Sequence, residues 1–304
     1  MPKAQVNGIS IAYEIAGKGT PIVWTPGGWF PRNAFTYLFA GRFSAHYSVL
    51  TWDRRNSGRS EIAIEDAVSE AHLWTDDLHA LLHELGMSPA YVGGGSAGCL
   101  MSLLMAYRYP EDVKGVILQD PPTDDIQSCQ GPLMEHHYLC LARAAERGGM
   151  EAVIELSTDP PDPEWAWISG WVAETIALNP GNRERLLSID PGRFAAIIDH
   201  WVEWFTSSRN HFAGLSDDEL AHITAPALVC PGLNEWHPER TARALYHLLP
   251  NADWVDYADR HTPAEVQEIV DIQTTTDFAP GTVQAFRYPY YEEFLQRVES
   301  GQFG

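Results

Sequence analysis

The sequence predicts an α/β fold in which a mostly parallel, doubly wound sheet is covered by helices. Short apolar runs typical of strands buried on both faces recur along the chain, and amphipathic helical segments separate most of them. Residues 3–16 alternate polar and apolar side chains around Asn7-Gly8, a strong hairpin signal. We therefore expect an antiparallel hairpin at one edge of this sheet.

The individual elements follow from local patterns. Strands are expected at residues 21–25, 48–53, 90–94, 116–120, 227–231 and 254–257. Residues 66–85, 96–107 and 238–249 carry apolar side chains at spacings of three and four, which is typical of a helix with one buried face, and Gly86 can cap the first of these helices. Strands and helices that alternate in this way favour parallel strands with helical crossovers.

Residues 123–224 interrupt this alternation. They contain no convincing strand, and helices are expected at 134–147, 165–178, 183–189, 193–205 and 217–223. We interpret the segment as a helical lid inserted into a core domain made of residues 1–122 and 225–304. Trp165, Trp167 and Trp201 either fill the core of this lid or, together with Trp29, line a pocket for an apolar or aromatic ligand.

The charge balance constrains the partners. A formal charge of -21, from 41 acidic and 20 basic residues, would repel nucleic acid and anionic membranes. The N-terminal region has no apolar signal segment, and no run of about 18 apolar residues could span a membrane. The four cysteines show no C-x-x-C spacing. We expect a cytoplasmic protein that acts on a small, hydrophobic molecule.

The stretch Gly93 to Gly98 fits two motifs. As G-x-G-x-x-G it is a loop that binds dinucleotide phosphates, and Asp120 follows Gly98 at about the distance of a ribose-binding acid. As G-x-S-x-G, centred on Ser96, it is the strand-to-helix turn that exposes a nucleophilic serine. A dinucleotide loop normally follows the first strand of its unit, whereas a hairpin and two further strands precede this one. An NAD(P)-dependent oxidoreductase is therefore the least favoured interpretation.

Four motifs resemble those of the α/β-hydrolase superfamily, in its branch of lidded serine hydrolases. TPGGW, residues 25–29, resembles the oxyanion loop of that family, with Pro26 in place of the usual histidine. DRRNSGRS, residues 53–60, resembles its D-x-R-G-x-G-x-S turn, with Asn56 in place of the first glycine. GGSAG is the nucleophile turn, and ADRHTP places His261 beyond a late strand, where the family carries its catalytic base.

The resemblance implies a nucleophile, a base, an acid and an oxyanion hole. Ser96 would be the nucleophile, His261 the base, and the backbone N–H groups of Gly28 and Ala97 the oxyanion donors. The acid has two candidates. Glu235, three residues after Gly232, matches the usual chain order Ser, acid, His, although alignment on Pro238 would place Asn234 at the acid position.

The second candidate for the acid is Asp120, at the end of the strand that follows the nucleophile helix. Some members of the superfamily, including the lactonases that act on the macrolide zearalenone, carry the acid at this place. An aspartate at a strand end can also cap the following loop, and His237, beside Glu235, is expected to shape the acid loop rather than to act as the base.

The resemblance implies a carboxylesterase or lactonase, and we expect no cofactor. The sequence has no H-E-x-x-H motif and no carboxylate cluster at metal-ligand spacing, so a metal-dependent hydrolase is not expected. A C–C bond hydrolase of the meta-cleavage type and a ligand receptor built on a hydrolase fold are the alternatives. The sequence also predicts a last helix that begins with Tyr288, Tyr290, Tyr291 and Phe294. This helix packs either on the sheet or on another subunit, and the second case would make the protein a homodimer.

Overall fold

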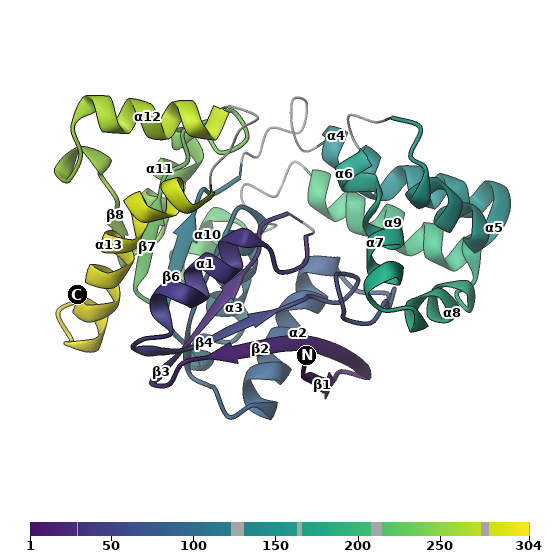
Figure 1. Ribbon diagram of the computed structural model, residues 1–304, viewed down its shortest axis with the longest axis horizontal. Helices are drawn as coiled ribbons and strands as arrows, with labels where there is room; N and C mark the ends of the chain where they lie inside the picture. The colour runs from purple at the N-terminus through teal and green to yellow at the C-terminus, as the bar shows by residue number, and fades with distance from the viewer. Residues whose placement is uncertain (29, 123–130, 163–165, 208–214, 275–279, 304) are drawn as a thin grey trace.

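A mostly parallel sheet forms the centre of the molecule (Figure 1). The computed structural model describes residues 1–28, 30–122, 131–162, 166–207, 215–274 and 280–303. Within these residues the sheet has eight strands in the order β1-β2-β4-β3-β5-β6-β7-β8. The strands are β1 (Lys3–Val6), β2 (Ile9–Ala16), β3 (Thr20–Thr25), β4 (Tyr47–Trp52), β5 (Ala90–Gly95), β6 (Val113–Gln119), β7 (Ala227–Cys230) and β8 (Ala252–Trp254).

Strand direction follows the sequence prediction. β2 runs antiparallel to β1 and to β4, whereas β4, β3, β5, β6, β7 and β8 run parallel to their neighbours. Asn7, at the hairpin turn, has a positive φ of 47°, and Gly8 follows with 77°, as a tight two-residue turn requires. The predicted α/β fold with an N-terminal hairpin is confirmed.

Helices cover both faces of the sheet. One face carries α1 (Ala34–Phe43) and α13 (Pro280–Glu299), and the other carries α2 (Glu70–Glu84), α3 (Ala97–Arg108), α10 (Asp217–Ala221) and α11 (Glu239–Leu248). Alternate side chains of a strand enter opposite cores. On β6, Val116 and Leu118 pack with the second group of helices, while Ile117 packs with Phe43 and Tyr291 of the first.

A helical lobe lies between β6 and β7 in the chain and beside the sheet in space (Figure 1). Its described elements are α4 (Gly131–Met134), a π-helical turn (Glu135–Leu139), α5 (Cys140–Thr158), α6 (Ala166–Ser169), α7 (Trp171–Leu178), α8 (Gly181–Leu187) and α9 (Pro191–Thr206). The apolar core of the lobe also includes Ile62 and Ile64 of the sheet domain. Asn182 fixes it to the sheet domain, because its amide accepts from the N–H of Ile62 and donates to the carbonyl of Ser60, both at 2.9 Å.

Several predicted elements differ from the structure. The helix expected at 165–178 is two helices, α6 and α7, which meet at Gly170, a residue of low helix propensity. β8 ends at Trp254, and a 3-10 turn at Tyr257–Asp259 replaces its predicted end. Two helices were not predicted, α1 and α12 (Pro263–Thr274).

The last helix also begins earlier than predicted. α13 starts at Pro280, a residue whose fixed φ suits the first turn of a helix, and not at Tyr288. Tyr288, Tyr291 and Phe294 are buried against α1 and the sheet, with the Tyr288 ring packed edge to face on Phe43 at 5.4 Å. The aromatic residues of α13 are therefore covered by the chain itself. In the part of the chain that the structure describes, no helix is long and apolar enough to cross a membrane.

Candidate active site

Ser96 lies in the sharp turn between β5 and α3. Its backbone has φ 52° and ψ -117°, a conformation that a non-glycine residue adopts only at a cost of about 1–3 kcal/mol. The turn also brings two backbones together: a Cβ on Gly94 would lie 2.4 Å from the carbonyl oxygen of Thr25, and one on Gly98 would lie 2.6 Å from the same atom. Only glycine fits at these two positions, which explains the small residues on both sides of Ser96.

The loop that follows β3 lies directly against this turn. A Cβ built on Gly27 would come within 3.3 Å of the Cβ of Ser96. Gly28 has a positive φ of 52°, and Ala97 is the first residue of α3, so its N–H has no acceptor inside the helix. The predicted oxyanion loop and the nucleophile turn are therefore neighbours in the fold, while the roles of the Gly28 and Ala97 N–H groups stay a prediction.

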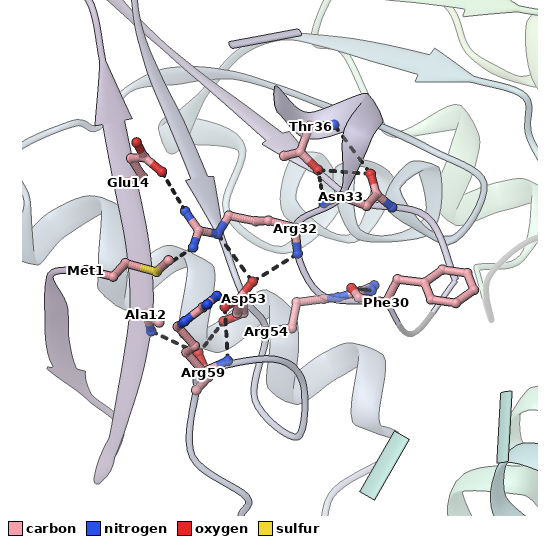
Figure 2. Close-up of polar contacts among 11 residues, drawn as sticks. Met1, Ala12, Glu14, Phe30, Arg32, Asn33, Thr36, Asp53, Arg54 and Arg59 are labelled. Carbon is pink, nitrogen blue, oxygen red and sulfur yellow. Dashed lines mark hydrogen bonds and ion pairs between the residues drawn. The ribbon is translucent and has the colours of Figure 1, made fainter. Parts of the chain in front are cut away.

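A buried ion-pair network holds the far end of this loop (Figure 2). The backbone N–H and the Nε of Arg32 donate to one carboxylate oxygen of Asp53, at 2.9 and 3.3 Å, and the N–H of Arg59 donates to the other oxygen at 3.0 Å. Arg32 also pairs with Glu14 of β2 at 3.1 Å. The network fixes residues 30–33 against the turn after β4 and against the N-terminal hairpin.

The two arginines of the DRRNSGRS turn have different surroundings. Arg55 forms a buried ion pair with Asp77 at 2.6 Å, which ties the turn to α2. The Nη2 of Arg54 donates to the carbonyl of Gly28 at 2.6 Å, while its Nε and Nη1 are buried without a hydrogen-bond partner. Its guanidinium stacks on Trp74 at 4.4 Å, and burial lowers its pKa to about 10. The contact with Gly28 places Arg54 directly behind the predicted oxyanion loop.

Asp120 follows β6 and is the second strained residue at this edge of the sheet. Its φ is 52°, and its N–H donates to the carbonyl of Cys230 at 3.0 Å. The N–H of Ser96 donates to the carbonyl of Gln119 at 2.9 Å, so the backbones of the two strained residues are linked through one peptide unit. Strained residues of this kind cluster at active sites.

The carboxylate of Asp120 is paired with a buried arginine from α13. Arg287, whose side chain is 1% exposed, lies 2.5 Å from Oδ1 of Asp120, whose side chain is 15% exposed. Burial alone would lower the pKa of Arg287, but the neighbouring Asp120 and Tyr257 raise it above its usual value. Gln284, one turn earlier on α13, donates to the side-chain oxygen of Gln119 at 3.0 Å. Helix α13 thus brings two polar side chains to the carboxyl end of β6.

Glu235 lies in the loop after β7, where its side chain is exposed. In the same loop the side-chain oxygen of Asn234 accepts from the N–H of His237 at 2.9 Å and faces its Nδ1 at 3.1 Å. His237 therefore shapes the acid loop, as expected from the sequence. It also lies close to Asp120, because a Cβ on Gly232 would be 2.3 Å from the Cβ of His237 and 3.2 Å from Oδ1 of Asp120.

The surroundings of His237 make it a second candidate for the base. Burial lowers the pKa of His237, and the nearby Asp120 opposes this shift. An imidazole beside a carboxylate that can orient it is the arrangement that a general base of this kind needs.

His261 lies in the turn between Asp259 and α12. Its Nε2 is buried and has no hydrogen-bond partner, so no hydrogen bond joins this atom to Ser96. The ring packs edge to face on Phe286 of α13 at 4.7 Å. The structure therefore brings Ser96 and Asp120 together at one edge of the sheet and leaves the role of His261 as a prediction.

The predicted ligand-lining tryptophans are only partly described. Trp29 and Trp165 lie outside the described residues, as does the side chain of Trp167 in α6. Trp201 is 2% exposed and belongs to the core of the helical lobe, with its ring edge to face on Tyr138 at 6.3 Å. The position of Trp201 matches a core role, which is one of the two roles expected from the sequence.

Comparisons with known proteins agree with this architecture. Residues 24–138 match the family model of the alpha/beta hydrolase fold. The chain is 37% identical over 119 residues to an uncharacterized hydrolase of Bacillus subtilis (strain 168), a match that covers 38% of this chain and 43% of that protein. The chain therefore spans less than half the length of this relative.

Two solved structures have the same fold. A putative lipase from Acinetobacter baumannii AYE superimposes with a TM-score of 0.60 at 18% identity and covers 99% of this chain and 92% of its own. Est816, an N-acyl homoserine lactone degrading enzyme, gives a TM-score of 0.54 at 20% identity and covers 84% of this chain and 90% of its own. The chain therefore has the α/β-hydrolase fold, and residues 24–138 match the family model of that fold.

Proposed function

We propose that the protein is a serine hydrolase that cleaves an ester or lactone bond of a hydrophobic small molecule through an acyl-enzyme intermediate. One observation carries the proposal: Ser96 has the strained backbone of a nucleophile turn and lies against the loop that would supply the oxyanion donors. A serine in an ordinary helix cap would need neither the strain nor the glycines around it.

The proposed reaction proceeds in two steps. The Oγ of Ser96 attacks the carbonyl carbon while a histidine takes its proton, and the N–H groups of Gly28 and Ala97 stabilise the oxyanion. The histidine then gives the proton to the leaving alkoxide. A water molecule, activated by the same histidine, hydrolyses the acyl-enzyme and restores Ser96.

His261 is the proposed base because it follows the last strand, as the superfamily requires. Catalytic hydrogen bonds are often long or poorly aligned until the substrate binds, so the unpaired Nε2 of His261 is compatible with this role. His237 is the alternative, and its nearness to Asp120 is the observation that favours it.

Burial favours Asp120 over Glu235 as the acid. A carboxylate that orients an imidazole does so most effectively where water competes least. Asp120 is mostly buried, strained and linked through Gln119 to the backbone of Ser96, whereas Glu235 is exposed. Arg287 pairs with the Oδ1 of Asp120, so the Oδ2 of Asp120 can accept from a histidine. The Nε2 of Gln119 also donates to this Oδ2, at 3.2 Å.

Labelling with a fluorophosphonate tests the nucleophile. The folded wild-type protein should be labelled at a single serine, and Ser96→Ala should lose the label. Ser102→Ala is the matched control, because Ser102 lies in α3 with its hydroxyl bonded to the carbonyl of Gly98 at 2.9 Å, and this variant should keep the label. A folded wild-type protein that resists labelling would instead indicate a ligand receptor on a hydrolase fold.

Assays of variants assign the base and the acid. Of His261→Asn and His237→Asn, the one that removes the base should lower kcat by about 10⁴-fold or more, and we expect this loss for His261→Asn. Asp120→Asn should be more damaging than Glu235→Gln, and the reverse order would return the acid to Glu235. A panel of aromatic esters, lactones and vinylogous diketones distinguishes ester or lactone cleavage from C–C bond hydrolysis.

A further inference from the structure

Two histidines and an aspartate lie together near the amino ends of the central strands, at the end of the sheet opposite to Ser96. His79 and His83 lie one turn apart on α2, and Asp112 immediately precedes β6, at its amino end. The Nδ1 of His79 is 2.6 Å from Oδ2 of Asp112, and the Nε2 of His83 is 3.0 Å from Oδ1. These side chains take no part in the proposed reaction, because Ser96 lies at the carboxyl end of the strands.

The three side chains offer one ligand atom each, and these atoms all lie within 4.8 Å of one another. Nitrogen from imidazole and oxygen from carboxylate are ligands that zinc, nickel and copper ions accept. A tetrahedral zinc site with bonds of about 2.0–2.1 Å separates its ligand atoms by about 3.4 Å. The nitrogens would need to withdraw from the carboxylate by less than about 1 Å, and His83, whose side chain is 55% exposed, has room to do so.

Neighbouring groups hold two of these ligands in place. The hydroxyl of Ser88 donates to Oδ1 of Asp112, whose side chain is 2% exposed. The ring of His79 stacks on Tyr109 at 4.0 Å with an interplanar angle of 10°, and the hydroxyl of Tyr109 is itself held by Asp76 at 2.7 Å. Supporting contacts of this kind orient the ligands of metal sites and restrict their rotation.

We propose that His79, His83 and Asp112 bind a divalent transition-metal ion, with Zn²⁺ as the representative ion. In the metal-bound form each neutral imidazole keeps its proton on the nitrogen that faces away, Nε2 of His79 and Nδ1 of His83, and the carboxylate supplies the negative charge. Water fills the remaining coordination positions. The ion joins the end of α2 to the segment before β6, so its role is structural, and it stabilises the sheet at the edge remote from the catalytic residues.

Calorimetric titration of the chelator-treated full chain with Zn²⁺ tests this site. The wild-type protein should bind one ion per chain with saturation. His83→Asn should weaken this binding at least tenfold, and it should keep the fold because the side chain is exposed. His222→Asn is the matched control: the exposed His222 lies 4.0 Å from the carboxylate of Asp218, outside the cluster, and this variant should bind as the wild type does.

Two further measurements test the site, one with a second variant and one with the wild type alone. Zn²⁺ at about 100 times the dissociation constant should raise the Tm of the wild type by about 5 °C and leave the Tm of His79→Asn almost unchanged. Co²⁺ should give the wild type an absorption spectrum of a nitrogen- and oxygen-ligated site. Absence of saturable binding by the wild type, or unchanged binding by both histidine variants, would overturn the proposal.

Discussion

Replacement of Arg287 by methionine should destabilise the protein far more than the loss of an ordinary ion pair. Arg287 is 1% exposed, and its partner Asp120 is 15% exposed, so the substitution leaves a mostly buried carboxylate without its cation. Removal of one partner from a buried pair typically costs about 3–5 kcal/mol. Because Asp120 keeps some contact with water and with Gln119, we expect a loss near the lower end, about 3 kcal/mol.

Arg297→Met provides the matched control on the same helix. Arg297 pairs with Asp253, but their side chains are 39% and 28% exposed, and such pairs contribute about 1 kcal/mol or less. Urea unfolding at pH 7.5, followed by circular dichroism, gives the free energy of unfolding of each variant. The double variant Arg287→Met with Asp120→Asn should lose less than the sum of the two single variants, by about 1–3 kcal/mol. The reasoning fails if Arg287→Met costs no more than Arg297→Met, or if the two substitutions are additive.

Packing and pH give two further predictions. Gly94→Ala should lower the free energy of unfolding by about 1–3 kcal/mol, because its Cβ would lie 2.4 Å from the carbonyl oxygen of Thr25. Gly41→Ala is the control: Gly41 lies in open space on α1, so this variant should raise the free energy of unfolding by about 0.5–1 kcal/mol. Equal stability of the two variants in urea would contradict this prediction. Burial lowers the pKa of His137 to about 3, so below pH 6.5 the unfolded state binds the proton, and His137 alone should lower the free energy of unfolding by about 2 kcal/mol by pH 5. The free energy of unfolding, measured in urea at pH 7 and pH 5, should fall less in His137→Gln than in the wild type, and should fall by the wild-type amount in His222→Gln. A pH dependence in His137→Gln equal to that of the wild type would refute the prediction.

The sheet was the most predictable part of the fold. Apolar runs such as residues 21–25 and 90–94 are typical of strands buried on both faces. The glycines around Ser96 indicate a tight turn, and the structure shows that a side chain at Gly94 or Gly98 would collide with Thr25. Helix α13 was only partly predicted because its apolar residues do not lie on one face. Tyr288 and Tyr291 are buried toward the sheet, while Arg287 is buried toward Asp120, so no regular periodicity marks its first turns.

The candidate site was predictable where the residues lie in a motif. Ser96 and the loop at residues 25–28 follow from spacing, but Arg287 and Gln284 belong to no motif, and only the fold brings them to β6. The histidine pair at 79 and 83 was also missed. Its spacing of four residues was visible in the sequence, yet the third group, Asp112, is 29 residues away from His83 and becomes a neighbour only when α2 packs beside the start of β6.

The pairing of Asp120 with Arg287 also has a consequence for the folding of the protein. The two residues are separated by 167 positions, and β7, β8 and α12 lie between them in the chain. We expect a contact between such distant residues to form late in folding, because closing so long a loop costs entropy that earlier contacts must offset. We therefore expect the carboxylate of Asp120 to gain its counter-charge late in folding. A fragment that contains β1 to β6 and the helical lobe would hold Ser96 and Asp120 but would lack Arg287, the buried counter-charge of Asp120.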